Sequence, residues 1–192
     1  MSIRNLEHLF APRSVAVIGA SDRPHSVGAT VLQNLLNGGF IGTSYPANPN
    51  HDVLFGHTSY ASVAALPAVP DLAIICTPAA MVPDIVAELG LAGTRAAIVL
   101  TAGMNALDET TGLSLHHAAL NAAKPHLLRL LGPNCVGLLV PGIGLNASFA
   151  HTNALPGKLA FVSQSGALVV GADPILTHRA DPNLTQGGTL RF

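Results

Sequence analysis

The sequence predicts an α/β fold with a doubly wound parallel sheet, and three observations carry that prediction. Hydrophobic residues make up 49% of the 192 residues and charged residues only 10%, so most elements must be buried on more than one side. Short runs rich in Val, Ile, Leu and Ala alternate with longer segments of helical periodicity. Each apolar run ends in glycine or small polar residues, the usual composition of loops that follow parallel strands. The pattern is typical of repeated right-handed βαβ units.

Five buried strands are predicted, at residues 14–18, 44–47, 71–75, 96–100 and 127–131. Apolar residues at helical spacing predict helices at 27–37, 56–65, 81–89 and 108–123. Gly38 and Gly90 should end the first and third of these helices. A short leading helix is predicted from Leu6, with Pro12 as its end.

The chain should divide into two α/β regions. Residues 1–140 form the first domain, and the glycines and prolines of 141–157 predict a linker. A fresh apolar run at 158–162 leads into Ser163, Gln164, Ser165 and Gly166, a loop of small residues that suits a phosphate. Residues 158–192 are therefore expected to be the truncated start of a second α/β domain, followed by an irregular tail over 169–192.

Composition excludes several classes of function. A net charge of -1 gives no electrostatic reason to bind nucleic acid or an anionic membrane, and no apolar run reaches the roughly eighteen residues of a membrane span. The first eight residues are too polar for a signal peptide. Cys76 and Cys135 lack the spacing of zinc or redox motifs. We therefore expect a cytoplasmic protein without a metal site.

The candidate ligand site lies where the predicted strands end. The carboxyl ends of parallel strands share one edge of a sheet, and open α/β sheets bind ligands there. Five clusters after successive strands therefore predict one ligand cleft, formed by Gly19, Ala20, Ser21, Asp22, Arg23, Pro24 and Gly28; by Asn48, Pro49 and Asn50; by Cys76, Thr77 and Pro78; by Thr101, Ala102 and Gly103; and by Asn134 and Cys135.

The first of these loops does not match the standard nucleotide motifs. A dinucleotide fingerprint needs G-x-G-x-x-G and an acidic residue at the end of the second strand. Here no glycine lies between Gly19 and Gly28, and the second strand ends in Ala47 and Asn48. A Walker A lysine is also missing. These departures count against an NAD(P)-binding Rossmann protein, which we keep as an alternative.

The order of the motifs resembles the CoA-binding domain of NDP-forming acyl-CoA synthetases, a family related to the succinyl-CoA synthetase alpha subunit and to multidomain protein lysine acetyltransferases. The resemblance covers residues 6–168. It rests on LFAPRSVAVIGAS at 9–21, NP at 48–49, DLAII at 71–75, TAG at 101–103, GPNCVG at 132–137 and GKLAFVSQSGAL at 157–168.

This resemblance implies coenzyme A, free or acylated, bound across the strand ends. Residues 21–24 would hold the phosphates through backbone N–H groups and the Ser21 hydroxyl. The clusters at 76–78 and 101–103 would line the adenosine and pantetheine path, and Asn134 and Cys135 would lie toward the thiol. In the family an acyl phosphate forms, CoA attacks it, and the phosphate passes to a histidine and then to ADP.

Two departures from the family pattern affect these expectations. Members often carry a lysine after the Asn-Pro pair, where this chain has Asn50. The phosphohistidine and ATP-grasp regions of the family do not fit after Leu168, and none of the nine histidines replaces them convincingly. Cys135 as a nucleophile is the weaker interpretation, because no Cys-His pair is discernible.

We therefore assign no catalytic residue and predict a CoA-binding module that is not catalytic alone. One alternative is an alpha-type subunit that is active only with an ATP-grasp beta-type subunit or with the missing C-terminal domains. Another is a gene fragment without a present role.

Overall fold

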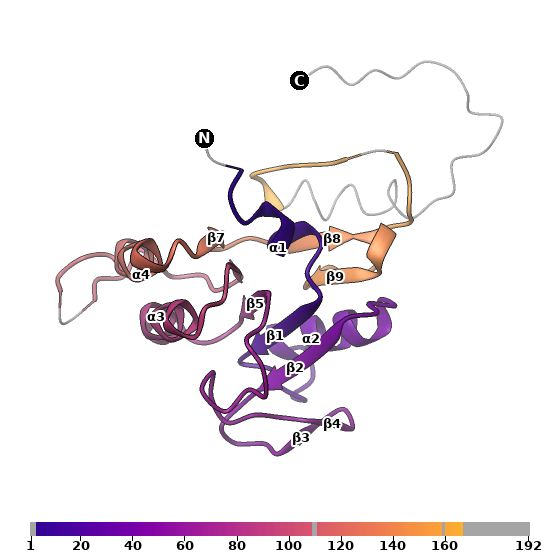
Figure 1. Cartoon of the computed structure of the whole chain (residues 1–192), viewed down its shortest axis with the longest axis horizontal. Helices are drawn as coiled ribbons and strands as arrows, with labels where there is room; N and C mark the ends of the chain where they lie inside the picture. The colour runs from indigo at the N-terminus through magenta and orange to yellow at the C-terminus, as the bar shows by residue number, and fades with distance from the viewer. Residues whose placement is uncertain (1–2, 109–110, 159, 167–192) are drawn as a thin grey trace.

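A five-stranded parallel sheet forms the centre of the computed structural model, which describes residues 3–108, 111–158 and 160–166 (Figure 1). The strand order is β2-β1-β5-β6-β7. These strands span Thr43–Ala47, Ser14–Ile18, Leu72–Ile75, Ala96–Val99 and Arg129–Leu131 in that order. All four neighbouring pairs are parallel, so the predicted doubly wound sheet is confirmed.

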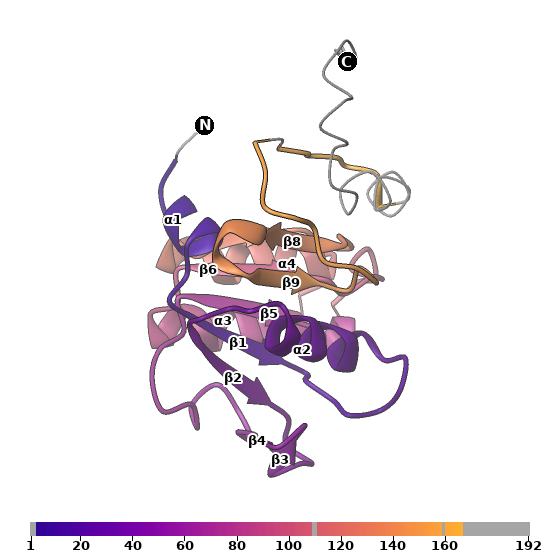
Figure 2. The ribbon, with the colours of Figure 1, turned by 90° about the vertical axis from the view of Figure 1, so that its right-hand side faces the viewer.

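Both faces of the sheet are buried, which explains the high apolar content. Val15, Val17 and Ile74 pack with α1 (Leu6–Phe10) and α2 (Val27–Asn37) on one face. Ala16 and Ile75, which alternate with them, pack with α3 (Val82–Ala92) and α4 (Leu115–Ala123) on the other. Figure 2 shows the sheet between these two layers. Because every central strand is buried on both sides, its sequence reads as a continuous apolar run.

Two predicted helices have shifted ends. α3 continues past Gly90 to Ala92 and is capped by Gly93, which has a φ of +101°, a conformation open to glycine without a side-chain clash. Short 3-10 turns precede α3 at Ala79–Met81 and follow α4 at Lys124–His126. α4 begins at Leu115, because the Ser114 hydroxyl accepts a hydrogen bond from the His117 N–H and caps the first turn. Of the residues predicted as its start, 109 and 110 lie outside the described residues.

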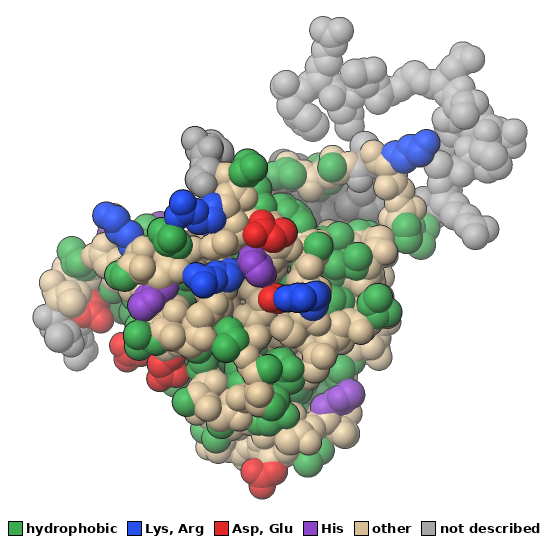
Figure 3. Space-filling model, in the orientation of Figure 1, with side chains coloured by type: hydrophobic (Ala, Val, Ile, Leu, Met, Phe, Trp, Pro, Cys, Tyr) green, Lys and Arg blue, Asp and Glu red, His purple; other side chains and the backbone are tan. Residues whose placement is uncertain are grey.

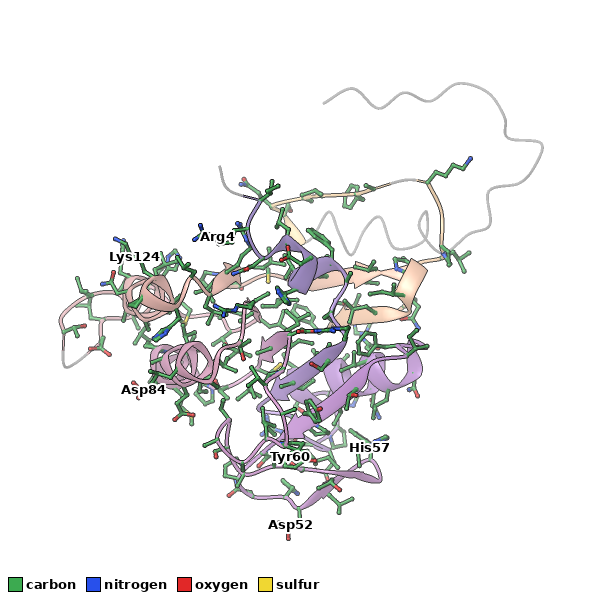
Figure 4. The ribbon with its side chains drawn as sticks, in the orientation of Figure 1. Arg4, Asp52, His57, Tyr60, Asp84 and Lys124 are labelled. Atoms are coloured by element: carbon green, nitrogen blue, oxygen red, sulfur yellow. The ribbon has the colours of Figure 1, made fainter. Side chains whose placement is uncertain are left out.

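The helix predicted at 56–65 is wrong. The chain there forms a small hairpin, β3 (Val53–Leu54) with β4 (His57–Thr58). It then bends at Tyr60, whose N–H donates to the Pro46 carbonyl and whose carbonyl accepts from the Asn48 N–H. These bonds extend the β2 side of the sheet, so the backbone groups of Tyr60 are unavailable to a helix. Figure 4 places Asp52, His57 and Tyr60 in this protruding region.

The predicted linker is also wrong in its first half. β8 (Gly137–Val140) and β9 (Leu145–Ser148) form an antiparallel hairpin, joined by the 3-10 turn Pro141–Ile143. β9 is fully buried and lies against α2. The Asn34 side-chain amide of α2 donates to the carbonyls of Ser148 and Ala150 at 2.9 and 2.8 Å. Residues 137–150 thus belong to the packed layer that covers the sheet.

The second α/β region remains a prediction. Residues 158 and 160–162, where a strand was predicted, have no strand conformation, and the tail after residue 166 lies outside the described residues. Within the described part of the chain, no helix has the length and hydropathy needed to cross a bilayer.

At the amino ends of the strands, Asp71 connects three elements. Its carboxylate, 17% exposed, accepts hydrogen bonds from the Arg13 backbone N–H at 2.9 Å and from Arg13 Nε at 3.4 Å. The other carboxylate oxygen lies 3.4 Å from His8 Nδ1 of α1. Burial alone would raise the pKa of Asp71, but the Arg13 hydrogen bonds and the nearby positive charge lower it below its ordinary value of 3.8.

We expect Asp71→Asn to lower the free energy of unfolding by about 1–2 kcal/mol at pH 7. A carboxyl with a lowered folded-state pKa stabilises the fold above its ordinary pKa, and this contribution is lost as the pH falls through the folded-state value. Urea unfolding should show the difference between variant and parent shrinking below about pH 3.8. Asp52→Asn, at an exposed site, is the control; an equal loss in that variant would contradict the role of Asp71.

Candidate functional site

The loop between β1 and α2 is held by a contact between two glycines. Gly19 follows β1 with a φ of +83°, and a Cβ there would lie 3.0 Å from the carbonyl carbon of Cys76. A Cβ on Gly28, in the first turn of α2, would lie 2.1 Å from the Gly19 carbonyl oxygen. Only glycine permits this approach without a shift of the backbone. The start of α2 is thereby pressed against the end of β1.

Residues 21–26 form a tight polar turn above that contact. The Ser21 hydroxyl accepts from the Arg23 N–H at 3.0 Å, and the Ser26 hydroxyl donates to the Arg23 carbonyl at 2.8 Å. Ser26 also caps α2 by accepting from the Ala29 N–H at 3.2 Å. Asp22, Arg23 and Pro24 are exposed. Ser26 was missed as a site residue, although a serine directly before a helical run is a known start signal.

Asn48 connects the ends of β2 and β1. Its side-chain amide donates to the Ala20 carbonyl at 2.7 Å, and its side-chain oxygen accepts from the Asn50 N–H at 2.8 Å. Pro49 and Asn50 are exposed beside it. In a dinucleotide-binding fold this position carries the acidic residue that holds the ribose. Here it is an amide engaged with the neighbouring loop, which disfavours the NAD(P) alternative.

The remaining strand ends are connected by a chain of hydrogen bonds. The Cys76 N–H donates to the Ile18 carbonyl at 2.8 Å, across from β5 to β1. The Thr101 hydroxyl donates to the Thr77 carbonyl at 2.8 Å, and the Thr101 carbonyl accepts from the Asn134 N–H at 3.0 Å. The structure therefore brings all five predicted clusters to one edge of the sheet, which we call the carboxyl edge. Pro78, Ala102 and Gly103 lie on its exposed rim or next to it.

One polar atom at this edge is buried without a partner. Thr77 Oγ1 has no hydrogen bond among the described residues, although its γ-methyl group packs against Gly19. A buried hydroxyl without a partner is energetically unfavourable. The atom therefore marks a place where a bound group could supply the missing hydrogen bond.

The two cysteines of the site are poor nucleophiles. Burial raises the pKa of the Cys76 thiol to about 12. Burial also raises the pKa of the Cys135 thiol, although hydrogen bonds from backbone groups of Gly137 and Cys135 oppose the shift. The Cys135 Sγ donates to the Val99 carbonyl at 3.5 Å. Both groups are thus neutral thiols near pH 7, and the nucleophile interpretation of Cys135 loses support.

The predicted phosphate loop at 163–166 approaches the carboxyl edge at Gly166. A Cβ on Gly166 would lie 3.1 Å from a methyl carbon of Val136, which follows Cys135. In the same loop the Ser163 hydroxyl accepts from the Ser165 N–H at 3.0 Å, and Gln164 is exposed. Across the described residues, no group of three or more His, Cys, Asp or Glu side chains is arranged to hold a metal ion.

Comparison with known protein families shows which family this chain belongs to. The family model described as "CoA binding domain" matches residues 13–141, more than half of the chain. The chain belongs to the CoA-binding domain family. The matched range covers every strand of the parallel sheet and all five clusters of the carboxyl edge.

Relatives of this CoA-binding domain are ADP-forming ligases. The chain is 39% identical over 165 residues to acetate–CoA ligase [ADP-forming] I of Archaeoglobus fulgidus, covering 86% of this chain and 24% of the relative. It is 38% identical over 168 residues to the alpha subunit of acetate–CoA ligase [ADP-forming] I of Pyrococcus furiosus, covering 85% and 36%. The chain therefore spans only about a quarter to a third of the length of these curated relatives.

A solved structure agrees with these matches. Acetyl-coenzyme A synthetase 1 of Candidatus Korarchaeum cryptofilum, in complex with phosphate and ADP, superposes with a TM-score of 0.81 at 38% identity. The match covers 90% of this chain and 36% of that one. The chain thus corresponds in sequence and fold to the CoA-binding part of ADP-forming acyl-CoA synthetases.

The raised thiol pKa values predict slow alkylation. We expect iodoacetamide at pH 8 to modify Cys76 and Cys135 at least about tenfold more slowly in the folded chain than in urea, because the thiolate is the reacting form. Mass spectrometry of quenched samples would follow each thiol separately. Rapid labelling of either cysteine in the folded chain at pH 7 would contradict the neutral-thiol assignment.

Proposed function

We propose that this chain binds CoA, free or acylated, across the carboxyl edge of its sheet. The observation that carries the proposal is the convergence of five loops at that edge, joined to one another by hydrogen bonds, in a chain of the CoA-binding domain family. Ligands of open α/β sheets bind at this edge because loops diverge there and helix N-termini point toward it. When bound, CoA would supply a thiol that accepts an acyl group.

The residues at the edge fit such a ligand. The unpartnered Thr77 hydroxyl offers a hydrogen bond to it. Gly19 and Gly28 keep side chains away from the β1–α2 loop, which allows close approach of a phosphate to the backbone. α2 begins in this loop, and the positive end of its dipole favours an anion.

We assign each cluster a part of CoA from its position along the carboxyl edge. Gly19 to Pro24 and Gly28 would hold the pyrophosphate. Asn48, Pro49 and Asn50 would form the neighbouring wall. The clusters at 76–78 and 101–103 would line the adenosine and pantetheine path, and Asn134 and Cys135 would lie nearer the thiol end. All of these side chains are neutral except those of Asp22 and Arg23, so short polar groups and backbone would make most of the contacts.

The proposal extends to the whole protein in which this domain acts. We infer an ADP-forming acyl-CoA ligase in which residues 1–140 bind CoA and residues 158–192 begin a second domain, with Ser163 to Gly166 as its phosphate loop. Relatives named alpha subunits support a partner subunit, and the family resemblance implies that this partner is of the ATP-grasp type. Both cysteines are free, as is usual in reducing compartments, which supports a cytoplasmic location.

Calorimetric titration with CoA tests the binding site. Arg23→Gln should raise the Kd for CoA about three- to tenfold, because it removes a cation from the phosphate loop. Arg95→Gln, an exposed arginine directly before β6 at the other edge, should leave the Kd unchanged. No heat at millimolar CoA would exclude the site, and equal losses in both variants would show that only net charge matters.

Ligase activity should require a partner. The chain alone should form no acyl-CoA from acetate, ATP and CoA, because its edge residues include no activated nucleophile. Addition of a protein encoded beside its gene that supplies both the phosphohistidine and the ATP-grasp parts should start ADP release that depends on both CoA and acetate. A coupled ADP assay follows this, with omission of CoA as control, and inactivity with every such candidate would contradict the subunit proposal.

A further inference from the structure

A chain of hydrogen bonds connects β9 to the segment that follows it. Asn146 and Ser148 of β9 are 2% and 0% exposed, and a buried polar group needs a partner to offset its lost hydration. The Ala150 N–H donates to Ser148 Oγ at 3.2 Å, and the Ser148 hydroxyl donates to Asn146 Oδ1 at 2.6 Å. The Asn146 amide nitrogen donates to Asn153 Oδ1 at 2.5 Å. The chain of bonds thus ends outside β9, on Asn153.

The first hydrogen bonds of this chain determine the direction of the last. Ser148 Oγ accepts from the Ala150 N–H, and the Ser148 hydroxyl proton is donated to Asn146 Oδ1. The oxygen of the Asn146 amide is therefore turned toward Ser148, and its nitrogen faces Asn153. An amide nitrogen only donates hydrogen bonds. Residue 153 must therefore offer an acceptor, which Asn153 does through its side-chain oxygen.

Asn153 belongs to a strap, residues 150–157, that leaves β9 and passes the hairpin β8–β9. The strap starts at Ala150, whose carbonyl accepts from the Asn34 side chain of α2 at 2.8 Å. Residues 151–153 and 155–157 are exposed, and Figure 3 shows the strap standing out at the upper right in tan and green. A cavity of about 200 Å³ lies between strap and hairpin, lined by Leu139, Pro141, Asn146, Asn153 and Pro156 among others. Because packing beneath the strap is incomplete, a directed hydrogen bond across this gap has a large part in placing it.

The path of the strap determines how the chain returns to the domain. After the strap, residues 160–166 lead to the 163–166 loop, where a Cβ on Gly166 would lie 3.1 Å from a methyl carbon of Val136. Val136 follows Cys135 at the carboxyl edge. A connecting segment with a fixed path keeps its end at a high local concentration near the target, whereas a segment with many paths dilutes it. A fixed strap therefore favours the contact between the loop and the carboxyl edge.

We propose that Asn146 and Asn153 form a latch that positions the 163–166 loop beside Val136. Asn146 is the buried half of the latch and Asn153 the exposed half, so Asn153 can be changed without opening a hole in the core. Both are positioning residues, because they act through the strap. The importance of this position rests on the proposed function, in which the loop binds phosphate, but the latch itself needs no CoA.

An engineered disulfide measures how well the loop is positioned. The 3.1 Å spacing suits the pair Val136→Cys and Gly166→Cys, in a chain that also carries Cys135→Ala so that the neighbouring thiol does not compete. In a glutathione redox buffer without CoA, the ratio of closed to open chains gives the effective concentration of the two thiols. Asn153→Ala should lower this effective concentration about three- to tenfold, because the hydrogen bond that fixes the strap is lost.

Two further variants separate the latch from a general effect on the strap. Asn153→Asp should keep the parent value, because a carboxylate oxygen still accepts from the Asn146 amide. Thr152→Ala changes the exposed neighbour of Asn153 and should also leave the value unchanged. Thermal unfolding midpoints of all these variants should agree, since the changed side chains are exposed.

Three outcomes would overturn the latch. They are an effective concentration for Asn153→Ala within about twofold of the parent, an equal loss in Thr152→Ala, and a failure of Asn153→Asp to retain the parent value. Absence of the disulfide in the parent pair would overturn the placement of the loop itself. Because CoA is left out, all of these results are independent of the CoA titration, whose failure would instead exclude the proposed binding site.

Discussion

The contact between Gly19 and Gly28 is the constraint on which the site depends. It presses the first turn of α2 onto the end of β1, with no room for a Cβ between the Gly28 position and the Gly19 carbonyl oxygen. α2 in turn supports β9 through Leu32 and Leu35 and through the Asn34 amide. A change at either glycine would therefore disturb the ligand loop and one covering layer of the sheet together.

The two edges of the sheet are held together by different kinds of hydrogen bond. At the amino edge, Asp71 joins α1, the start of β1 and the start of β5 through charged hydrogen bonds, which stabilise the fold. At the carboxyl edge the connections are made by backbone groups and by the neutral side chains of Asn48 and Thr101. These connections carry no net charge, so a ligand at the proposed site would be recognised mainly by shape and hydrogen bonding, aided by Arg23 and the start of α2.

The central elements were predictable because one physical pattern determines them. Residues 15–18 and 72–75 are buried on both faces, so their apolar runs identify strands without any other signal. The site clusters followed from the same logic, since each comes directly after such a run. The two hairpins were not predictable in this way. β3 and β4 have two residues each, and β9, LNAS, carries buried Asn146 and Ser148, which join each other by a side-chain hydrogen bond.

The arrangement also limits what the carboxyl edge can do chemically. Burial keeps both thiols protonated, and Thr77, Thr101 and Asn134 offer hydrogen bonds rather than a base. These groups can orient a thiol-bearing cofactor, but none of them is poised to attack a carbonyl or to accept a phosphoryl group near pH 7. In the ligase proposed above, the reactive thiol would come from CoA and the phosphate acceptor from another part of the enzyme. The side chains that line the carboxyl edge are thus suited to holding a ligand rather than to covalent chemistry on it.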